Sequence, residues 1–155
     1  MEILAQFNII LVLFFTVFLL SACNQAENVT YCNDSRHYIV NVLSFEVSPD
    51  PMLVGRPATI IISASTSQPI SDGKAVIDVS FLGLHVHTET RDLCEEVSCP
   101  VAAGNFVLSH SQTLPVFRKQ GSYTLQMTLH DENNLELTCI RIKFIIGNAS
   151  FASNS

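Results

Sequence analysis

The feature of this sequence that most limits its fold is the alternation of apolar and polar residues in short runs. The runs are separated by Gly, Pro, Asn, Asp and Ser, and none keeps a helical period. Since successive side chains of a strand point to opposite faces, the alternation predicts β-strands. The predicted strands are 39–47, 58–65, 76–89, 106–114, 123–129 and 135–146.

Two local signals refine this pattern. In 76–89 the apolar positions change face, from Ile77, Val79 and Phe81 to Leu84 and Val86, so we expect a β-bulge near the glycine at position 83. The run 131–134 predicts the turn of a hairpin. Six or seven such strands in one domain predict an all-β fold, an immunoglobulin-like two-sheet antiparallel β-sandwich. The chain has no tryptophan, which argues against an antibody-type core.

The first 23 residues are set apart by an almost unbroken apolar run, 7–22, that ends in Ser21, Ala22 and Cys23. Small residues after such a run predict a signal peptide, 1–23, cleaved after Cys23. Two alternatives stay open: a retained membrane anchor, and a lipoprotein leader in which Cys23 is acylated. The domain organisation that follows is a leader at 1–23, one domain at 24–150 and a flexible tail at 151–155.

The charge of the chain argues against a nucleic-acid partner. The formal net charge is −6, and removing the leader takes away one acid, Glu2, which leaves −5. Nucleic acids and anionic membranes bind proteins through dense Lys and Arg, whereas this chain has only eight basic residues, scattered along it.

Four cysteines remain after the leader, Cys32, Cys94, Cys99 and Cys139. The short spacing of Cys94 and Cys99 favours a disulfide between them, which leaves Cys32 to pair with Cys139. A zinc site is the alternative, but the spacing fits one poorly. Three Asn-x-Ser/Thr tripeptides predict glycosylation at Asn28, Asn33 and Asn148. Both features indicate the secretory pathway, with the extracellular space, the vacuole or lysosome and the endoplasmic reticulum lumen as destinations.

Several strands are apolar on more than one face, as in the consecutive residues Ile60, Ile61 and Ile62. A well-packed core explains this, and composition alone favours that explanation. The alternative is a cavity between the sheets that a long-chain lipid fills.

Four segments resemble the ML lipid-recognition family: CEEVSCPV at 94–101, HSQTLP at 110–115, GSYTL at 121–125 and DENNLELTC at 131–139. Within that family the chain is most similar to plant phosphatidylglycerol/phosphatidylinositol transfer proteins, and the Niemann–Pick sterol-transfer protein is a more distant relative. The likeness runs from about Tyr31 to Ile146. The vertebrate sterol carrier has a further disulfide that this chain lacks, so sterol specificity is not carried over.

The resemblance implies a sandwich that opens along one edge to admit a lipid tail, with the cysteine pairing given above. The function it implies is lipid binding and transfer in the secretory pathway, by a monomer that holds a phospholipid or sterol and contacts membranes transiently. No cofactor, metal or enzymatic activity is expected. A protein-interaction module with a filled core, of receptor or immune type, is the alternative. The candidate lipid-binding residues are Phe45, Ile60, Ile62, Val79, Phe81, Leu84, Val86, Val101, Phe106, Leu108, Phe117, Leu125, Met127, Leu129, Ile142 and Phe144.

The loop 114–119 is the candidate mouth of the cavity, because it places Val116 and Phe117 beside two cations. Arg118 and Lys119 are the candidate ligands of a phosphate headgroup. An ordinary solvated loop is an equally good interpretation of this segment.

Histidines supply the remaining candidates for chemistry. His85, His87 and Glu89 alternate along one strand, but a metal site would need a further ligand. His110 lies between Ser109 and Ser111, and adjacent strand residues point to opposite faces, so it cannot readily activate either hydroxyl. The sequence therefore favours a protein that binds rather than one that catalyses.

Overall fold

The structure, a computed structural model, describes residues 29–113 and 119–148. Its elements are β1 (Val29–Tyr31), β2 (Val40–Ser48), β3 (Met52–Leu53), β4 (Pro57–Thr66), β5 (Gly73–Phe81), β6 (Leu84–Asp92), α2 (Leu93–Glu96), β7 (Gly104–Thr113), β8 (Gly121–Asp131) and β9 (Glu136–Gly147). The expected leader and C-terminal tail lie outside the described residues, as do Asn28, Phe117 and Arg118. Within the described part of the chain, no helix has the length and apolar character that a membrane crossing needs.

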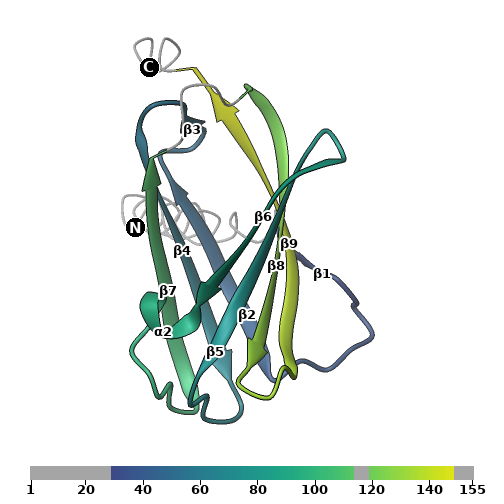
Figure 1. Cartoon of the computed structure of the whole chain (residues 1–155), viewed down its shortest axis with the longest axis vertical. Coiled ribbons are helices and arrows are strands. Elements are labelled where there is room, and N and C mark those ends of the chain that lie inside the picture. Colours follow the sequence, from purple (N-terminus) through teal and green to yellow (C-terminus); the bar gives the residue numbers. More distant parts are fainter. Residues whose placement is uncertain (1–28, 114–118, 149–155) are drawn as a thin grey trace, which may run out of the picture.

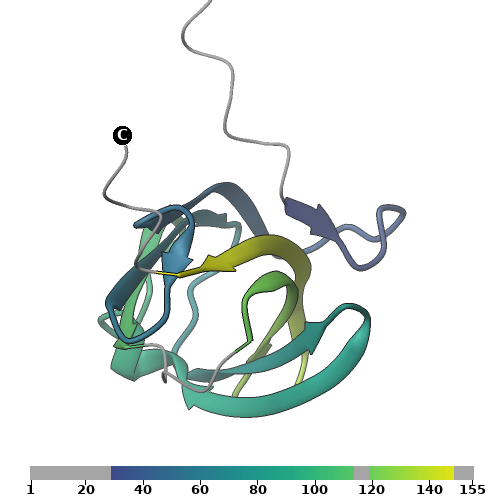
Figure 2. The same cartoon turned by 90° about the horizontal axis from the view of Figure 1, so that it is seen from above.

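Two sheets face each other, which confirms the all-β sandwich (Figure 1). The larger sheet has the order β1-β9-β8-β5-β6, with β3 added in parallel to β9. The smaller sheet has the order β2-β4-β7. Apart from β3, the pairs are antiparallel. Figure 2 looks along the sandwich from above and shows β1 and the β5–β6 hairpin at opposite edges of the larger sheet.

The prediction of one continuous strand over 76–89 is wrong. The chain reverses at Leu82 and Gly83, which have φ values of 49° and 82°, and β5 and β6 form a hairpin. Two successive residues with positive φ are typical of the tight type I′ turn. A glycine at a change of apolar face fits either a bulge or a turn, which is why sequence alone misassigned it. The actual irregularity in pairing lies between Val79 and Ser80.

β2 contains a second irregularity that the alternation did not predict. Its pairing with β4 shifts between Val42 and Ser44, so the intervening Leu43 turns outward and is 57% exposed. The expected common face through residues 39, 41, 43, 45 and 47 is therefore broken. The predicted turn at 131–134 is confirmed, since the carboxylate of Asp131 accepts hydrogen bonds from the backbone N–H groups of Asn133 (2.9 Å) and Leu135 (2.8 Å).

The apolar interior is divided along the sandwich into two clusters. The larger one contains fully buried residues of β9, β8 and α2, among them Ile140, Leu129 and Leu93. The smaller one gathers Met52 and Tyr123 with other residues at the end where β9 finishes. Figure 1 shows the two sheets diverging toward that same end. Burial of this kind supplies most of the stability of a small β-domain.

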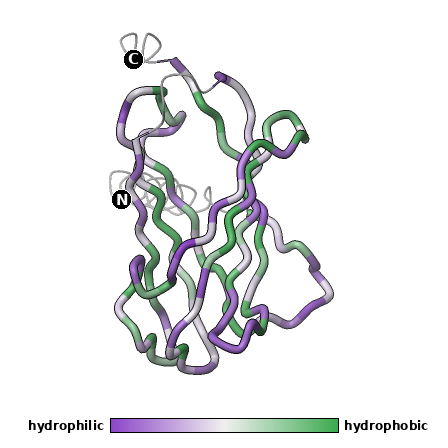
Figure 3. Tube along the Cα trace, viewed as in Figure 1, coloured by the Kyte–Doolittle hydropathy of each residue, from purple (hydrophilic) through white to green (hydrophobic). Residues whose placement is uncertain are grey.

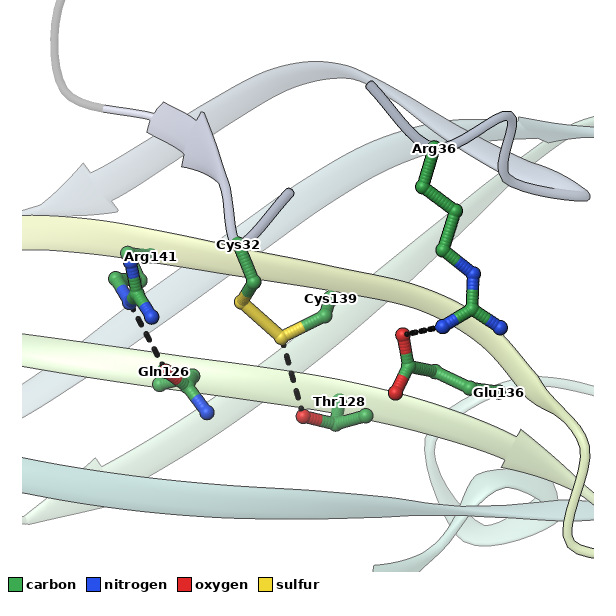
Figure 4. The surroundings of a disulfide bond; sticks show 7 residues. All are labelled: Cys32, Arg36, Gln126, Thr128, Glu136, Cys139 and Arg141. Atoms are coloured by element: carbon green, nitrogen blue, oxygen red, sulfur yellow. Dashed lines mark hydrogen bonds and ion pairs between the residues drawn. A yellow bond between two sulfur atoms is a disulfide. The ribbon is translucent and has the colours of Figure 1, made fainter. Parts of the chain in front are cut away.

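Both predicted disulfides are present. Cys32 is bonded to Cys139, and Cys94 to Cys99. The first bond joins the segment after β1 to β9, and the hydroxyl of Thr128 on β8 donates to the sulfur of Cys139 at 3.4 Å (Figure 4). The second closes a short loop around α2. Disulfides persist in oxidising compartments, so the pair is consistent with a secretory or extracellular protein.

Candidate functional site

An apolar cavity lies between the two sheets. Its empty space is about 600 Å³, including its opening to solvent. The apolar part of its wall comes from β2, β4, β5, α2, β7, β8 and β9, through Phe45, Ile60, Ile62, Ala75, Ile77, Leu93, Leu108, Leu125, Met127 and Ile142. Arg91, Glu96 and His110 complete the wall.

A second cavity, of about 820 Å³ on the same measure, adjoins the first toward the smaller apolar cluster. The two share Ile60, Ile77, Arg91, Leu125 and His110, so they lie next to each other between the sheets. The other residues of the second wall are Met52, Ala58, Val79, His87, Glu89, Gln112, Tyr123, Phe144 and Ile146. Walls made mostly of apolar and aromatic side chains, with a few polar groups among them, are typical of small-molecule sites.

The polar residues of this space lie along one side of the sandwich, where the edge strands β6 and β7 meet α2 (Figure 1). His110 Nδ1 on β7 lies 3.0 Å from Glu96 Oε1 on α2. Arg91 on β6 reaches the same oxygen at 3.8 Å through Nη1 and meets Glu89 Oε1 at 2.5 Å through Nη2. The edge between the two sheets is therefore crossed by charged side chains rather than by backbone pairing.

Local sequence accounts for these positions. On β7 the side chains at 106, 108, 110 and 112 share a face, so the buried Leu108 is followed inward by His110 and Gln112. On β6 the same rule places His87, Glu89 and Arg91 on one face. Asp92 then caps α2 by accepting a hydrogen bond from the N–H of Cys94 at 2.7 Å, and this turn carries Glu96 toward His110.

Nine of the sixteen predicted lipid-binding residues line this space: Phe45, Ile60, Ile62, Val79, Leu108, Leu125, Met127, Ile142 and Phe144. Four others lie in or against the packed core: Phe81, Val101, Phe106 and Leu129. Phe81 packs on Tyr123, with ring centroids 4.8 Å apart, behind the second cavity. Phe117 and Arg118 lie outside the described residues, and Lys119 is exposed, with its backbone carbonyl accepting a hydrogen bond from the Tyr123 hydroxyl at 2.7 Å.

The expected inward placement of Leu84 and Val86 is wrong. Both lie on β6 just after the hairpin turn and are 72% and 44% exposed. A single strand over 76–89 predicts an inward position for both, and the turn at Leu82 and Gly83 reverses that placement. Figure 3 colours the tip of this hairpin hydrophobic and much of β6 below it hydrophilic.

Sequence reasoning missed the polar side of the space. No sequence pattern marks Arg91 or Glu96 as site residues, and the position of His110 between two serines predicts no place for it in a cavity. The alternation 106, 108, 110, 112 could have placed His110 on the inner face, because Phe106 and Leu108 were already assigned there. The approach of Glu96 depends on how the turn of α2 packs against β7, which no local pattern reveals.

The other polar candidates do not assemble into a larger site. His85 lies 3.6 Å from Asp78, and His87 lies 3.7 Å from Glu89 in the wall of the second cavity. Among the described residues, one group has metal-ligand spacing, Asp72, Asp92 and Cys94, but the sulfur of Cys94 is committed to a disulfide. Asn33 is exposed and Asn148 is half-buried, and glycosylation at either residue stays a prediction.

This combination of fold and site defines a class: disulfide-bonded β-sandwiches with an apolar cavity between their sheets. The family model of the ML domain matches residues 26–146, and the chain belongs to this family. It is 33% identical to a putative phosphatidylglycerol/phosphatidylinositol transfer protein of Dictyostelium discoideum, over 71% of this chain and 79% of that protein. A phosphatidylglycerol/phosphatidylinositol transfer protein of Aspergillus oryzae is 30% identical over 72% of this chain and 67% of its own length.

A solved structure supports the fold independently. The crystal structure of a Niemann-Pick type C2 protein from the Japanese carpenter ant is similar with a TM-score of 0.61. The likeness covers 76% of this chain and 99% of that protein at 13% identity, which shows a shared fold. The predicted family and fold class are therefore confirmed.

Proposed function

We propose that this protein binds a lipid between its two sheets and transfers it between membranes. The observation that carries the proposal is the pair of neighbouring, mostly apolar cavities lined by residues of both sheets. Two relatives named as phosphatidylglycerol/phosphatidylinositol transfer proteins support a phospholipid as the cargo. The proposal includes no chemical step.

The apolar wall provides the driving force for binding. Burying an acyl chain yields about 0.8 kcal/mol for each methylene, so half of a 16-carbon tail would contribute roughly 6 kcal/mol before the costs of association. A wall of aliphatic and aromatic side chains such as Ile62, Leu125 and Phe144 requires no specific polar contact for this part of the affinity.

A protein-interaction module with a filled core is not favoured. That alternative requires the side chains of the two sheets to fill the space between them, whereas Phe45, Leu108 and Met127 border an empty region. The family and the named relatives also point to lipid.

Transfer requires contact with a membrane, and the β5–β6 hairpin offers a surface for it. Leu82 and Leu84 at its turn are each 72% exposed. The turn follows Phe81, which packs on Tyr123 in the wall of the second cavity. Exposed apolar side chains beside a lipid site favour brief insertion into a bilayer surface. We further propose that the protein acts as a monomer and works in the extracellular space, the vacuole or lysosome, or the endoplasmic reticulum lumen.

Lipid extracted from the purified protein and identified by mass spectrometry tests the proposal. A variant sharpens the test: Leu125→Trp fills the part of the space that the two cavities share, and it should abolish loading. Leu43→Trp is the matched control, because Leu43 is a strand leucine that is 57% exposed outside the cavity. If the protein carries no lipid, or if Leu125→Trp loads as well as the control, the proposal is wrong.

A further inference from the structure

Two buried nitrogen atoms at the polar side of the cavity have no hydrogen-bond partner. They are Arg91 Nε and His110 Nε2, and neither finds one among residues 29–113 and 119–148. Both side chains line both cavities. A buried polar atom left without a partner costs free energy, so such atoms in the wall of a binding site indicate where a ligand's polar group is received.

The hydrogen-bonding role of each nitrogen follows from its neighbours. The guanidinium of an arginine has five N–H donors and no acceptor, so Arg91 Nε is a donor. His110 Nδ1 lies 3.0 Å from Glu96 Oε1, and a carboxylate only accepts, so Nδ1 carries the hydrogen. In the neutral imidazole, Nε2 is then an acceptor. Since both side chains meet the same oxygen of Glu96, this donor and this acceptor belong to neighbouring side chains.

We propose that Arg91 and His110 bind a hydroxyl group of the lipid cargo. A hydroxyl accepts one hydrogen bond and donates another, so it satisfies Arg91 Nε and His110 Nε2 together. This inference rests on the proposed lipid-binding function and specifies the ligand chemistry at the cavity's polar side. A diacylglycerol, a sterol and a phospholipid with a polyol headgroup all supply such a hydroxyl.

The local charge favours a hydroxyl over an anion. The carboxylates of Glu89 and Glu96 flank the guanidinium of Arg91, at 2.5 Å and 3.8 Å. These three charged groups sum to one negative charge. A phosphate or a fatty-acid carboxylate placed here would be repelled, whereas an uncharged hydroxyl avoids that cost. Phosphate binding at this point is the competing outcome that the experiment separates.

The test measures which lipids the protein removes from vesicles. The purified chain is incubated with dioleoylphosphatidylcholine vesicles that contain equal fractions of dioleoylglycerol, phosphatidylglycerol, phosphatidylinositol, phosphatidic acid and ergosterol. It is then re-isolated, and its bound lipid is quantified by mass spectrometry. A hydrogen bond to a charged group corresponds to about a tenfold preference, so one or more hydroxyl-bearing lipids should exceed phosphatidylcholine by that factor. The member that is enriched identifies the source of the hydroxyl.

Variants connect this preference to the two nitrogens. Arg91→Lys keeps a cation beside Glu89 but removes the Nε–H, and His110→Leu removes the acceptor while keeping an apolar strand residue. Each should reduce the enrichment about tenfold, measured as the ratio of hydroxyl-bearing lipid to phosphatidylcholine bound in the same sample. Matched controls are Arg141→Lys, whose Nε already donates to Gln126 at 3.0 Å on the outer face, and His37→Leu at an exposed loop position.

Three results would overturn the inference. One is enrichment of phosphatidic acid equal to that of the hydroxyl-bearing lipids, since that places a phosphate at the site. Another is an enrichment that both variants retain, because the nitrogens are then satisfied in some other way. The third is uptake of all lipids without preference, which would leave the proposed lipid binding intact. Uptake of no lipid at all would instead refute the proposed function on which this inference depends.

Discussion

The two long edges of the sandwich are held in different ways. At one edge, β1 and β9 of the larger sheet face β2 of the smaller sheet, and the chain between them is fixed by the Cys32–Cys139 disulfide and by a 2.9 Å hydrogen bond from the N–H of Val42 to the hydroxyl of Tyr31. At the other edge, β6 and β7 are linked by α2 and by the side chains of Arg91, Glu96 and His110. We call these the tied edge and the ionic edge.

The difference between the two edges indicates the side of the sandwich at which a lipid can enter. At the tied edge the disulfide holds the segment after β1 on β9, and the hydrogen bond from Val42 to Tyr31 joins β1 to β2 of the other sheet. Ion pairs between partly exposed side chains can be broken at little cost, since each contributes about 1 kcal/mol or less to the free energy of unfolding. The cavity residues with charged groups all lie at the ionic edge, so opening there costs the fold least.

The largest effect is expected from breaking the tied edge covalently. Replacing Cys32 and Cys139 together by serine opens a loop with a sequence separation of 107 residues. In the chain-entropy model, closing this loop contributes about 4 to 5 kcal/mol to the free energy of unfolding. The Cys94–Cys99 bond, with a separation of 5, contributes about 2 kcal/mol. Denaturant unfolding of both double variants measures the two losses. Equal losses would contradict the assignment of the tied edge as the main constraint.

A smaller effect is expected from the hydrogen bond that joins the sheets there. Tyr31→Phe leaves the N–H of Val42 without its acceptor and should lower the free energy of unfolding by about 1 to 2 kcal/mol. The ring stack of Tyr31 on Tyr38, at 5.4 Å between centroids, is kept. Tyr38→Phe is the control, and it should cost less because the ring contact is preserved. A Tyr31→Phe protein as stable as that control would show that the hydroxyl contributes nothing to the edge.

Much of this fold could be predicted from sequence, and the reasons for the failures are local. Alternation located β4, β7, β8 and β9 because each is long and keeps one register with a neighbour over most of its length. It failed at Gly83, where a turn and a bulge produce the same pattern, and at β1, β3 and α2, which are too short to show a period.

The site was predictable only in its apolar part. Ile62 lines the cavity and Leu129 does not, yet both are buried apolar residues in strands that alternate in the same way. Sequence alone cannot distinguish residues that line a cavity from residues that pack in a filled core, because the distance between the two sheets depends on tertiary structure. The contact of Glu96 with His110, fourteen residues away, likewise depends on the packing of α2.

At the ionic edge, Glu96→Gln should have a modest effect on stability. It removes the charge that pairs with His110 and Arg91, while Arg91 keeps Glu89 as a partner. We expect a loss of about 1 kcal/mol in dilute buffer that shrinks in concentrated salt, since partly exposed ion pairs are screened. Thermal unfolding at several salt concentrations measures it. A loss as large as that of the Cys32/Cys139 double variant would remove the distinction between the two edges.

The smallest effect is expected from the ion pair at the tied edge. Arg36 Nη1 meets Glu136 Oε1 at 2.9 Å, but the side chains are 45% and 30% exposed (Figure 4). Such exposed pairs contribute about 0 to 1 kcal/mol, so Glu136→Gln should change the free energy of unfolding by less than about 0.5 kcal/mol. Denaturant unfolding compares it with Tyr31→Phe. If Glu136→Gln proved the more damaging of the two, the tied edge would depend on charge in the same way as the ionic edge, and lipid entry could no longer be assigned to one side on this ground.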